Sequence, residues 1–333
     1  MAKVMLVGAG NIGSTLYSRL REFGHKVLFV VRSGGIYKDL TKRNQLKGRN
    51  LFDCYDEVDI VCLAIPTADN GVVALDYLLG ALGRGKPVVT CEKGALSNFF
   101  SVLEDWLPNT GYSATVGGGT RLLDYARDRV GPDTQEIHAV LNGTLNFIFD
   151  EISRGRSLGE VVAEAKKLGY AEPGAENPID ILNMEACRDV PMKAAIVFNI
   201  LGLGNISAFN IESRPLDEAG LKQLLREAHK RRFIVSITRD SDLEPDVIGG
   251  FRVENNGWVI SAGFKNTHAN PLFARLVLGG VNNALLIHEG RDGVDGTYVV
   301  SGQGAGAFPT TKAMLIDVQR LLKSNSSKRR VRK

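Results

Sequence analysis

Short apolar segments alternate with longer amphipathic segments in the first third of the chain. Segments of strand length and helix length that alternate in this way predict a β-α-β series and a doubly wound parallel sheet. The expected strands cover residues 4–7, 26–31, 58–65 and 86–90, and the expected helices cover residues 14–23 and 75–82. We therefore expect an α/β fold for this region.

The hydrophobic pattern changes from about residue 114. Ser157 and Glu160 form a capping box that predicts a helix start, and Gly169 ends that helix. A second helix is expected to open at Asp189, because a proline such as Pro191 is tolerated only in the first turn of a helix.

The remaining apolar segments predict a second sheet and a last helix. The expected strands cover residues 136–141, 233–238, 247–253, 258–264 and 284–288, and the last helix covers residues 309–322. Strands and helices mixed in this way predict a second domain of the α+β class, and the boundary is expected between residues 113 and 114.

A glycine-rich turn, G-A-G-N-I-G, follows the first expected strand at residues 8–13. Gly8 allows a tight turn, Gly10 lets the backbone approach a pyrophosphate, and Gly13 lets the next helix pack closely on the strand. The start of that helix, with Asn11 and Ile12, would then face the phosphates. This context predicts a Rossmann-type dinucleotide site.

The end of the second expected strand indicates which dinucleotide binds. An acid about 20 residues after the glycines would bind the ribose 2′-hydroxyl, but this chain has Arg32 and Ser33 there. Arg32 can pair with a 2′-phosphate or stack on adenine, so we expect NADP(H) to be preferred over NAD(H). The alternative is that Arg32 is an ordinary surface arginine.

Ligands of doubly wound sheets bind beyond the carboxyl ends of the strands. Thr67 and Lys93 follow two of the expected strands at this edge, so we expect both on the nicotinamide side.

Composition and charge narrow the class of protein. The 333 residues allow two domains, and no apolar run reaches membrane-spanning length. The first strand begins almost directly after Met1, and the four cysteines form no CxxC pair, so we expect reduced thiols and a cytoplasmic protein without a membrane partner. The net charge of +4 comes from a basic tail at residues 323–333, which is more typical of a solvated, disordered terminus than of a nucleic-acid site.

Eight separated segments, in order along nearly the whole chain, resemble the homoserine dehydrogenase family. That family interconverts L-aspartate 4-semialdehyde and L-homoserine with NAD(P)H, in threonine and methionine biosynthesis. The matching segments are residues 8–13, 89–94 (VTCEKG), 115–119 (TVGGG), 141–146 (LNGTLN), 169–173 (GYAEP), 189–193 (DVPMK), 270–272 (NPL) and 302–306 (GQGAG).

The resemblance implies roles for two lysines. Lys193 resembles the catalytic lysine of the family, and Lys93 resembles a second lysine near nicotinamide and substrate. Aldehyde reduction needs a hydride at carbon and a proton for the developing alkoxide, and a positioned ammonium group can donate that proton or stabilise the charge.

The resemblance also implies a site for an amino-acid substrate. Glu172 and Asp189 resemble acids that bind its ammonium group, although Asp189 as a plain helix cap and Glu172 as a solvated loop acid remain alternatives. The segment between them is longer than usual, so Asp180 competes with Asp189 for this role. The Asn142-Gly143-Thr144 turn is expected to shape the pocket, with its polar groups on the substrate carboxylate, unless it is only a turn after the strand.

The remaining implications concern the whole chain. Residues 1–113 would bind the dinucleotide, residues 114–300 the substrate and a partner subunit in a homodimer, and residues 301–322, with Gly304, would return to the nucleotide domain. The chain ends soon afterwards, so we expect no regulatory small-ligand domain. Family members often bind a monovalent cation such as Na⁺ through carbonyls, here those of Ser113, Val116, Gly118 and Thr120, although a turn without metal fits equally well.

Two alternatives to the homoserine reaction remain open. The Thr120-Arg121 pair replaces an apolar residue and proline of the family, and this departure leaves room for an NADP-dependent enzyme that acts on another amino-acid semialdehyde. A protein that binds NADP(H) without turnover is the other alternative, although the retained lysines and acids argue against it.

Overall fold

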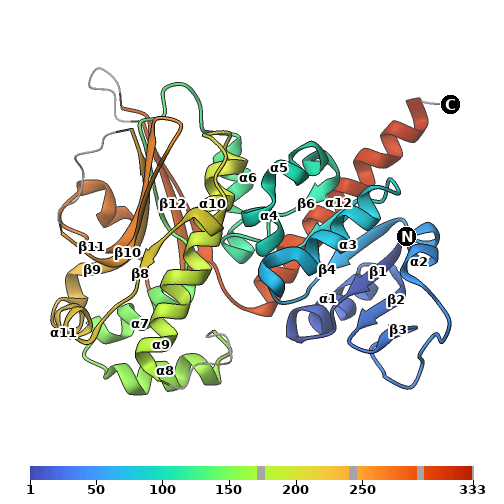
Figure 1. Cartoon of the computed structure of the whole chain (residues 1–333), viewed down its shortest axis with the longest axis horizontal. Coiled ribbons are helices and arrows are strands. Elements are labelled where there is room, and N and C mark those ends of the chain that lie inside the picture. Colours follow the sequence, from blue (N-terminus) through green and yellow to red (C-terminus); the bar gives the residue numbers. More distant parts are fainter. Residues whose placement is uncertain (171–176, 240–245, 291–295, 332–333) are drawn as a thin grey trace. The chain divides into compact units, whose positions relative to one another are not determined.

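The computed structural model describes residues 1–170, 177–239, 246–290 and 296–331, with side chains up to residue 324. The chain divides into two compact units, coloured along the sequence in Figure 1. The first unit combines Met1–Thr115 with Ala307–Lys333, and the second unit is Val116–Gly306. The last segment of the chain therefore belongs to the same unit as its beginning.

The first unit is built on a six-stranded sheet in the order β3-β2-β1-β4-β5-β6. The pairs β1–β2, β1–β4, β4–β5 and β5–β6 are parallel, and β3 is antiparallel to β2 at one edge. The strands are β1 (Lys3–Val7), β2 (Lys26–Arg32), β3 (Gly35–Tyr37), β4 (Ile60–Leu63), β5 (Val88–Thr90) and β6 (Thr110–Gly111). This topology confirms the predicted Rossmann-type fold.

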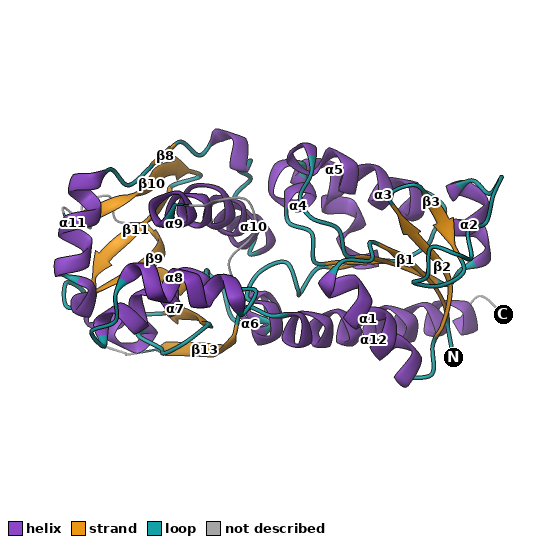
Figure 2. Ribbon diagram, turned by 90° about the horizontal axis from the view of Figure 1, so that it is seen from below, coloured by secondary structure: helices purple, strands orange, loops and turns teal. Residues whose placement is uncertain are grey.

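The described residues of the first unit form six α-helices. They are α1 (Asn11–Glu22), α2 (Leu51–Glu57), α3 (Val72–Leu82), α4 (Gly94–Asn98), α5 (Phe100–Leu103) and α12 (Ala307–Val331). Helix α12 lies along α1, as Figure 2 shows, and its buried Met314 and Val318 share one apolar core with Leu16 and Leu20. The last helix is therefore part of the core of the first unit.

Helix α12 extends further than the sequence predicts. It continues to Val331, nine residues beyond the expected end at Leu322, so most of the basic tail expected to be disordered is helical here. No glycine or proline follows Pro309 in this segment, and the intervening residues include good helix formers, so no residue stops the helix.

The second unit holds a seven-stranded antiparallel sheet in the order β13-β12-β7-β9-β11-β10-β8. The strands are β7 (Glu136–Val140), β8 (Ser213–Arg214), β9 (Arg231–Thr238), β10 (Val247–Asn255), β11 (Trp258–Asn266), β12 (Asn282–His288) and β13 (Thr297–Gln303). This sheet confirms the predicted α+β class of the second domain. The edge strands β8 and β13 were not predicted.

The α-helices described in the second unit pack on this sheet or on one another. They are α6 (Leu122–Arg127), α7 (Gly143–Ser153), α8 (Leu158–Lys167), α9 (Pro178–Met184), α10 (Val190–Ile200) and α11 (Glu218–Arg226). Helix α7 packs on the sheet through Phe149, whose ring centroid lies 4.7 Å from that of Phe264 on β11. The predicted capping box of Ser157 and Glu160 is present at the start of α8.

The helix expected to open around Asp189 is present as α10, with Asp189 as its N-cap residue and Pro191 in its first turn, but it continues from α9 without a loop. Residues from Pro178 to Ile200 wind continuously, because α9 and α10 are joined by a π-helical turn at Glu185–Asp189. The amide of Val190 bonds the carbonyl of Glu185, five residues back. Pro191 has no amide hydrogen, and a π turn lets a helix pass such a residue without breaking.

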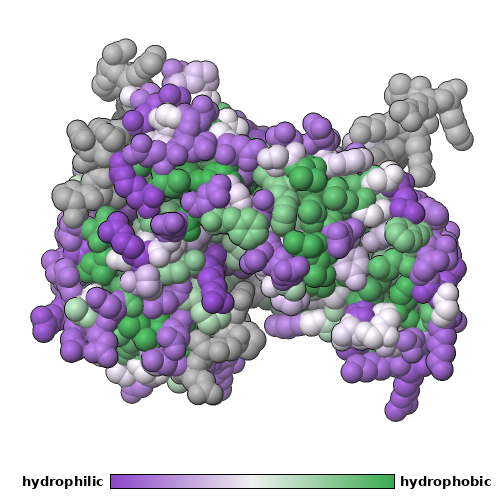
Figure 3. Space-filling view, in the orientation of Figure 1, coloured by the Kyte–Doolittle hydropathy of each residue, from purple (hydrophilic) through white to green (hydrophobic). Residues whose placement is uncertain are grey.

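Figure 3 shows a mostly hydrophilic surface, with apolar residues gathered over α3, α4 and α5 of the first unit. The exposed apolar side chains of α3 and α5 include Val72, Val73 and Val102. No helix among the described residues is both long and apolar enough to cross a membrane. The four cysteines are free thiols, and burial raises the pKa of Cys62 to about 12.

Candidate active site

The glycine turn of the first unit has the geometry that a dinucleotide site requires. Gly8 has a φ of +100°, and a Cβ atom added there would lie 2.1 Å from the carbonyl oxygen of Ala64. A Cβ atom on Gly13 would lie 2.3 Å from the Gly8 carbonyl oxygen, whereas one on Gly10 would meet nothing within 4 Å. Helix α1 begins at Asn11 without a side-chain cap on its first amides. These residues therefore fit a bound pyrophosphate.

Arg32 is the last residue of β2 and is held by the loop that follows. Its guanidinium donates to the carbonyl of Leu40 at 2.9 Å and lies 6.0 Å from the centre of the Tyr37 ring. Its buried Nε atom has no hydrogen-bond partner. Ser33, next to it, is exposed. These contacts favour an oriented guanidinium over a freely mobile surface arginine.

Thr67 and Lys93 are linked by an acid that the sequence analysis missed. Glu92 is 2% exposed, and one of its oxygens accepts from the Thr67 hydroxyl and from the amide of Gly94. Its other oxygen accepts from the amide of Ala95 at 3.0 Å. Glu92 therefore holds the start of α4, where Lys93 is the capping residue. Its place directly before Lys93 was the only signal in the sequence.

In the second unit, Lys193 and Asp189 form a buried ion pair. Lys193 Nζ lies 2.6 Å from Asp189 Oδ2 and donates to the carbonyl of Leu141 at 2.9 Å. The two side chains are only 12% and 11% exposed. The predicted common face of these residues, four apart on one helix, is thus confirmed. Asp180, the competing acid, is exposed in the first turn of α9.

Asn142 connects this pair to a second acid. Its side-chain oxygen accepts from the amide of Leu145, which caps α7, while its nitrogen donates to Asp189 at 2.8 Å and to Glu185 at 2.5 Å. Glu185 is 6% exposed and lies in the π turn. The sequence places Asn142 in the expected pocket turn but gives no sign of its bond to Glu185, because the two residues lie 43 positions apart along the chain.

Gly143 and Thr144, the two predicted pocket residues, start α7 next to Asn142. A Cβ atom on Gly143 would lie 2.7 Å from the Val281 carbonyl oxygen, so a glycine is needed for this close approach. The Thr144 hydroxyl donates to the carbonyl of Tyr170 at 2.7 Å. The predicted Glu172 lies outside the described residues.

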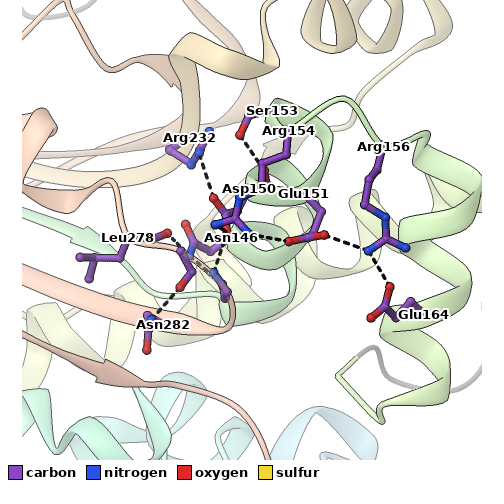
Figure 4. Close-up of polar contacts among 12 residues, drawn as sticks. Asn146, Asp150, Glu151, Ser153, Arg154, Arg156, Glu164, Arg232, Leu278 and Asn282 are labelled. Atoms are coloured by element: carbon purple, nitrogen blue, oxygen red, sulfur yellow. Dashed lines mark hydrogen bonds and ion pairs between the residues drawn. The ribbon is translucent and has the colours of Figure 1, made fainter.

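The loop against which Gly143 packs is anchored by α7. Asn146 donates to the carbonyls of Leu278 and Gly280 at 2.7 and 2.8 Å, and Asp150 accepts from the amide of Gly280 at 2.8 Å. Arg154 pairs with Asp150 at 2.9 Å, and Figure 4 shows these side chains gathered between α7 and the loop. Helix α7 therefore fixes both the turn and the backbone opposite it.

Gly304 lies in the second unit, just after β13. Its amide donates to the carbonyl of Val281 at 3.0 Å, and a Cβ atom there would lie 1.1 Å from Asn283 Oδ1. A side chain there would have to displace the buried Asn283, which donates to the Val140 carbonyl at 2.7 Å.

The residues predicted to hold a cation fall in both units. The amide and the hydroxyl of Ser113 each donate to Asp317 of α12 at 2.9 Å, within the first unit. Val116, Gly118 and Thr120 belong to the second unit, where the Thr120 amide donates to the Gly117 carbonyl. Among the described residues, no three His, Cys, Asp or Glu side chains lie together as metal ligands, and this finding does not bear on carbonyl ligands.

Comparison with known proteins assigns the family. The family model for homoserine dehydrogenase matches residues 124–319, more than half of the chain. The chain belongs to the homoserine dehydrogenase family. It is 27% identical over 273 residues to the homoserine dehydrogenase of Neisseria gonorrhoeae, a match that covers 77% of this chain and 56% of that protein. The chain thus spans little more than half of the length of this relative.

Two further members of the homoserine dehydrogenase family differ in their named cofactor. The NAD(+)-dependent homoserine dehydrogenase of Pseudomonas canavaninivorans is 26% identical over 269 residues, covering 78% of this chain and 69% of that protein. A solved hyperthermophilic archaeal homoserine dehydrogenase in complex with NADPH aligns with a TM-score of 0.68 at 21% identity. It covers 97% of this chain and 98% of that one, which shows a common fold.

Proposed function

We propose that this protein is a homoserine dehydrogenase that interconverts L-aspartate 4-semialdehyde and L-homoserine with NADP(H). The buried Lys193–Asp189 pair beside the Asn142-Gly143-Thr144 turn is the observation that carries the proposal. According to the family resemblance, these two positions carry the catalytic lysine and an acid that binds the substrate. Membership of the family and the geometry of the glycine turn support the reaction class.

Lys193 serves as the proton donor in the direction of reduction. Bound NADPH supplies the hydride to the aldehyde carbon, and the aldehyde oxygen then needs a proton. An ammonium group has three donors, so Lys193 can bond Asp189, the Leu141 carbonyl and the substrate oxygen together. The proton passes from Nζ to this oxygen, and homoserine results. In the reverse direction the neutral amine accepts the proton of the alcohol.

Acidic residues bind the ammonium group of the substrate. Asp189 and Glu172 take this role in our proposal, because two carboxylates form charge-assisted hydrogen bonds with an ammonium group. The exposed position of Asp180 favours Asp189 over it. Gly143 and Thr144 border the pocket, and Lys93 stands as the second lysine beside nicotinamide and substrate.

The cofactor residues lie in the first unit. The turn with Gly8, Gly10 and Gly13 receives the pyrophosphate, and Arg32 with Ser33 receives the 2′-phosphate of NADP(H). The NADPH complex of the archaeal relative supports this choice, while the NAD(+)-dependent relative shows that the family name alone does not decide it. Thr67 completes the proposed cofactor residues of this unit.

Two further parts of the proposal concern assembly and ions. The family resemblance supports a homodimer. Light scattering on the purified protein would then give twice the mass of the chain. The resemblance also supports a monovalent cation on the carbonyls of Ser113, Val116, Gly118 and Thr120. Exchange of sodium for a large organic cation would then lower the rate or the thermal midpoint.

Initial rates with a panel of substrates test the proposed function. We expect kcat/KM for L-aspartate 4-semialdehyde with NADPH to exceed that for the semialdehyde one methylene longer by at least tenfold. A reversed order would favour the enzyme of another amino-acid semialdehyde. NADPH binding without turnover of any substrate would favour the non-catalytic alternative.

A further inference from the structure

Asn142 has an unusual position in the site, because each polar group of its side chain has a partner. The carboxamide oxygen accepts from the Leu145 amide at 2.7 Å. The nitrogen uses its two hydrogens on two acids, Asp189 at 2.8 Å and Glu185 at 2.5 Å. Asn142 itself is 4% exposed. A buried carboxamide bonded in this way has one orientation only.

One hydrogen bond of Asn142 ends on the same Asp189 oxygen that contacts Lys193. Asp189 Oδ2 accepts from Asn142 and also lies 2.6 Å from Lys193 Nζ. The residue before Asn142, Leu141, supplies the carbonyl that holds the same Nζ atom at 2.9 Å. Two consecutive residues between β7 and α7 thus fix both members of the ion pair.

The π turn brings the second acid to the same amide. The bond from the Val190 amide to the Glu185 carbonyl spans five residues, and the turn ends at Asp189. Both Glu185 and Asp189 then reach Asn142 from one continuous helix. The NH₂ group separates two buried carboxylates that would otherwise repel each other.

We propose that Asn142 is a positioning residue, which orients Asp189 and through it Lys193 while Glu185 fixes the far side of the carboxamide. This proposal rests on the proposed function for its kinetic consequence. A misplaced proton donor costs rate rather than cofactor binding, because proton transfer requires hydrogen-bond geometry.

The variant Asn142→Asp tests the proposal. It keeps the size and the capping oxygen, since aspartate caps helices as well as asparagine, but it replaces the donor by a third carboxylate. We expect kcat to fall at least tenfold while the Kd for NADPH stays within twofold. The matched control is Asn50→Asp at the exposed cap of α2, which should leave kcat unchanged. A kcat within twofold of the wild type would overturn the proposal.

Asn142→Ser covers the case in which the charged variant does not fold. Serine also caps helices, and it introduces no charge while it removes both amide hydrogens. The same loss of kcat with unchanged NADPH binding is expected. If Asn142 only caps α7, this variant keeps the rate of the wild type.

A labelling experiment separates this proposal from the proposed function. Acetic anhydride acetylates neutral amines, and peptide mass spectrometry reports the rate at Lys193 without any turnover. A third carboxylate beside Asp189 favours the ammonium form, so Asn142→Asp should slow acetylation of Lys193 at least threefold at fixed pH. Equal rates in the wild type, Asn142→Asp and Asn50→Asp would contradict the role of Asn142. Absence of turnover in the wild type would contradict only the reaction.

Discussion

Lys193 and Asp189 illustrate how burial makes two ordinary side chains into a reactive pair. Each is about nine-tenths buried, and Lys193 Nζ is held by a carboxylate and a carbonyl at hydrogen-bond distance. Breaking such a buried pair is costly, because the remaining charge loses its partner. The geometry therefore holds a proton donor at a fixed place, as general acid catalysis requires.

Lys193→Met should abolish most turnover. Methionine keeps much of the apolar stem but carries no proton, so we expect kcat to fall by roughly 10² to 10⁴-fold. NADPH should still bind, which a fluorescence titration measures. The control is Lys167→Met, an exposed lysine of α8, which should keep the rate of the wild type. Retained turnover in Lys193→Met would remove its proposed role.

Arg32→Ala should change the choice of cofactor. The lost charge-assisted hydrogen bonds contribute about 1.5–3 kcal/mol, so the Kd for NADPH should rise at least tenfold. NADH carries no 2′-phosphate, and its Kd should change much less. Arg226→Ala, an exposed arginine of α11, serves as the control. Equal losses for both cofactors would refute the phosphate contact.

At the residue scale, the sequence predicts contacts between residues that are close along the chain, but not contacts between distant residues. The spacing of Asp189 and Lys193 predicts their shared helical face, and the structure places them in contact. Asn142 and Glu185 have no such spacing, because they are 43 residues apart and meet only in the folded chain. Glu92 was missed for another reason, since a loop acid gives no sign of burial.

Helix α7 shows how one element organises several parts of the second unit. Its first residues carry Asn142 at the cap, and its later residues Asn146 and Asp150 hold the loop before β12. The structure pairs Asp150 with Arg154 and, more loosely, with Arg232 at 3.8 Å. This element therefore couples the stability of the unit to the geometry of the turn.

Asp150→Ala should destabilise the protein markedly. The change takes the nearby carboxylate from the buried Arg232 and the acceptor from the part-buried Gly280 amide, so we expect a loss of about 2 kcal/mol in the free energy of unfolding. Chemical denaturation measures this loss. Asp128→Ala is the control, because Asp128 is 78% exposed and its pair with Arg127 is long at 3.7 Å. That variant should change the free energy by less than about 0.5 kcal/mol.

Hydrogen bonds that link Glu136 and His138 of β7 to Ser236 of β9 make the stability of the fold depend on pH. The His138 ring bonds Glu136 at 2.7 Å and the Ser236 hydroxyl at 2.8 Å. The bond to His138 lowers the pKa of Glu136 below its ordinary value, although burial opposes the shift. An acid with a lowered pKa stabilises the fold above its unfolded pKa and loses this effect as pH falls through the folded value.

Glu136→Gln should therefore be less stable than the wild type at pH 7, by about 1 kcal/mol for a partly exposed charged hydrogen bond. The difference should disappear as pH falls below about 4.3, the ordinary pKa of glutamate. Urea unfolding at several pH values measures it. Glu254→Gln, whose carboxylate is 69% exposed, is the control. A difference that is constant with pH would contradict the assignment.

At the element scale, periodicity and capping predict most helices and the central strands. The helix expected to open around Asp189 is present as α10, but its π-helical link to α9 was not predicted, because no local pattern reveals a π turn. The edge strands β8 and β13 were also missed. β8 has two residues, and β13 lies at the sheet edge with no fully buried side chain, so its apolar pattern is weak.

The whole molecule consists of two units, each with its own sheet and core. The chain leaves the first unit after Thr115 and returns to it at Ala307, where α12 completes the apolar core around α1. Local patterns predict the parallel sheet of the first unit, because its strands and helices alternate in order along the sequence. The order of the antiparallel strands depends on distant pairings, which a single sequence does not display.

The account rests on one reaction, and its products test it most directly. Purified protein would be incubated with NADPH and an excess of L-aspartate 4-semialdehyde, and the products would be identified by mass spectrometry. We expect one L-homoserine for each NADPH oxidised, and the formation of NADPH when L-homoserine and NADP⁺ are supplied instead. Homoserine absent from both the wild type and the Lys167→Met control, with NADPH bound but unchanged, would contradict the account.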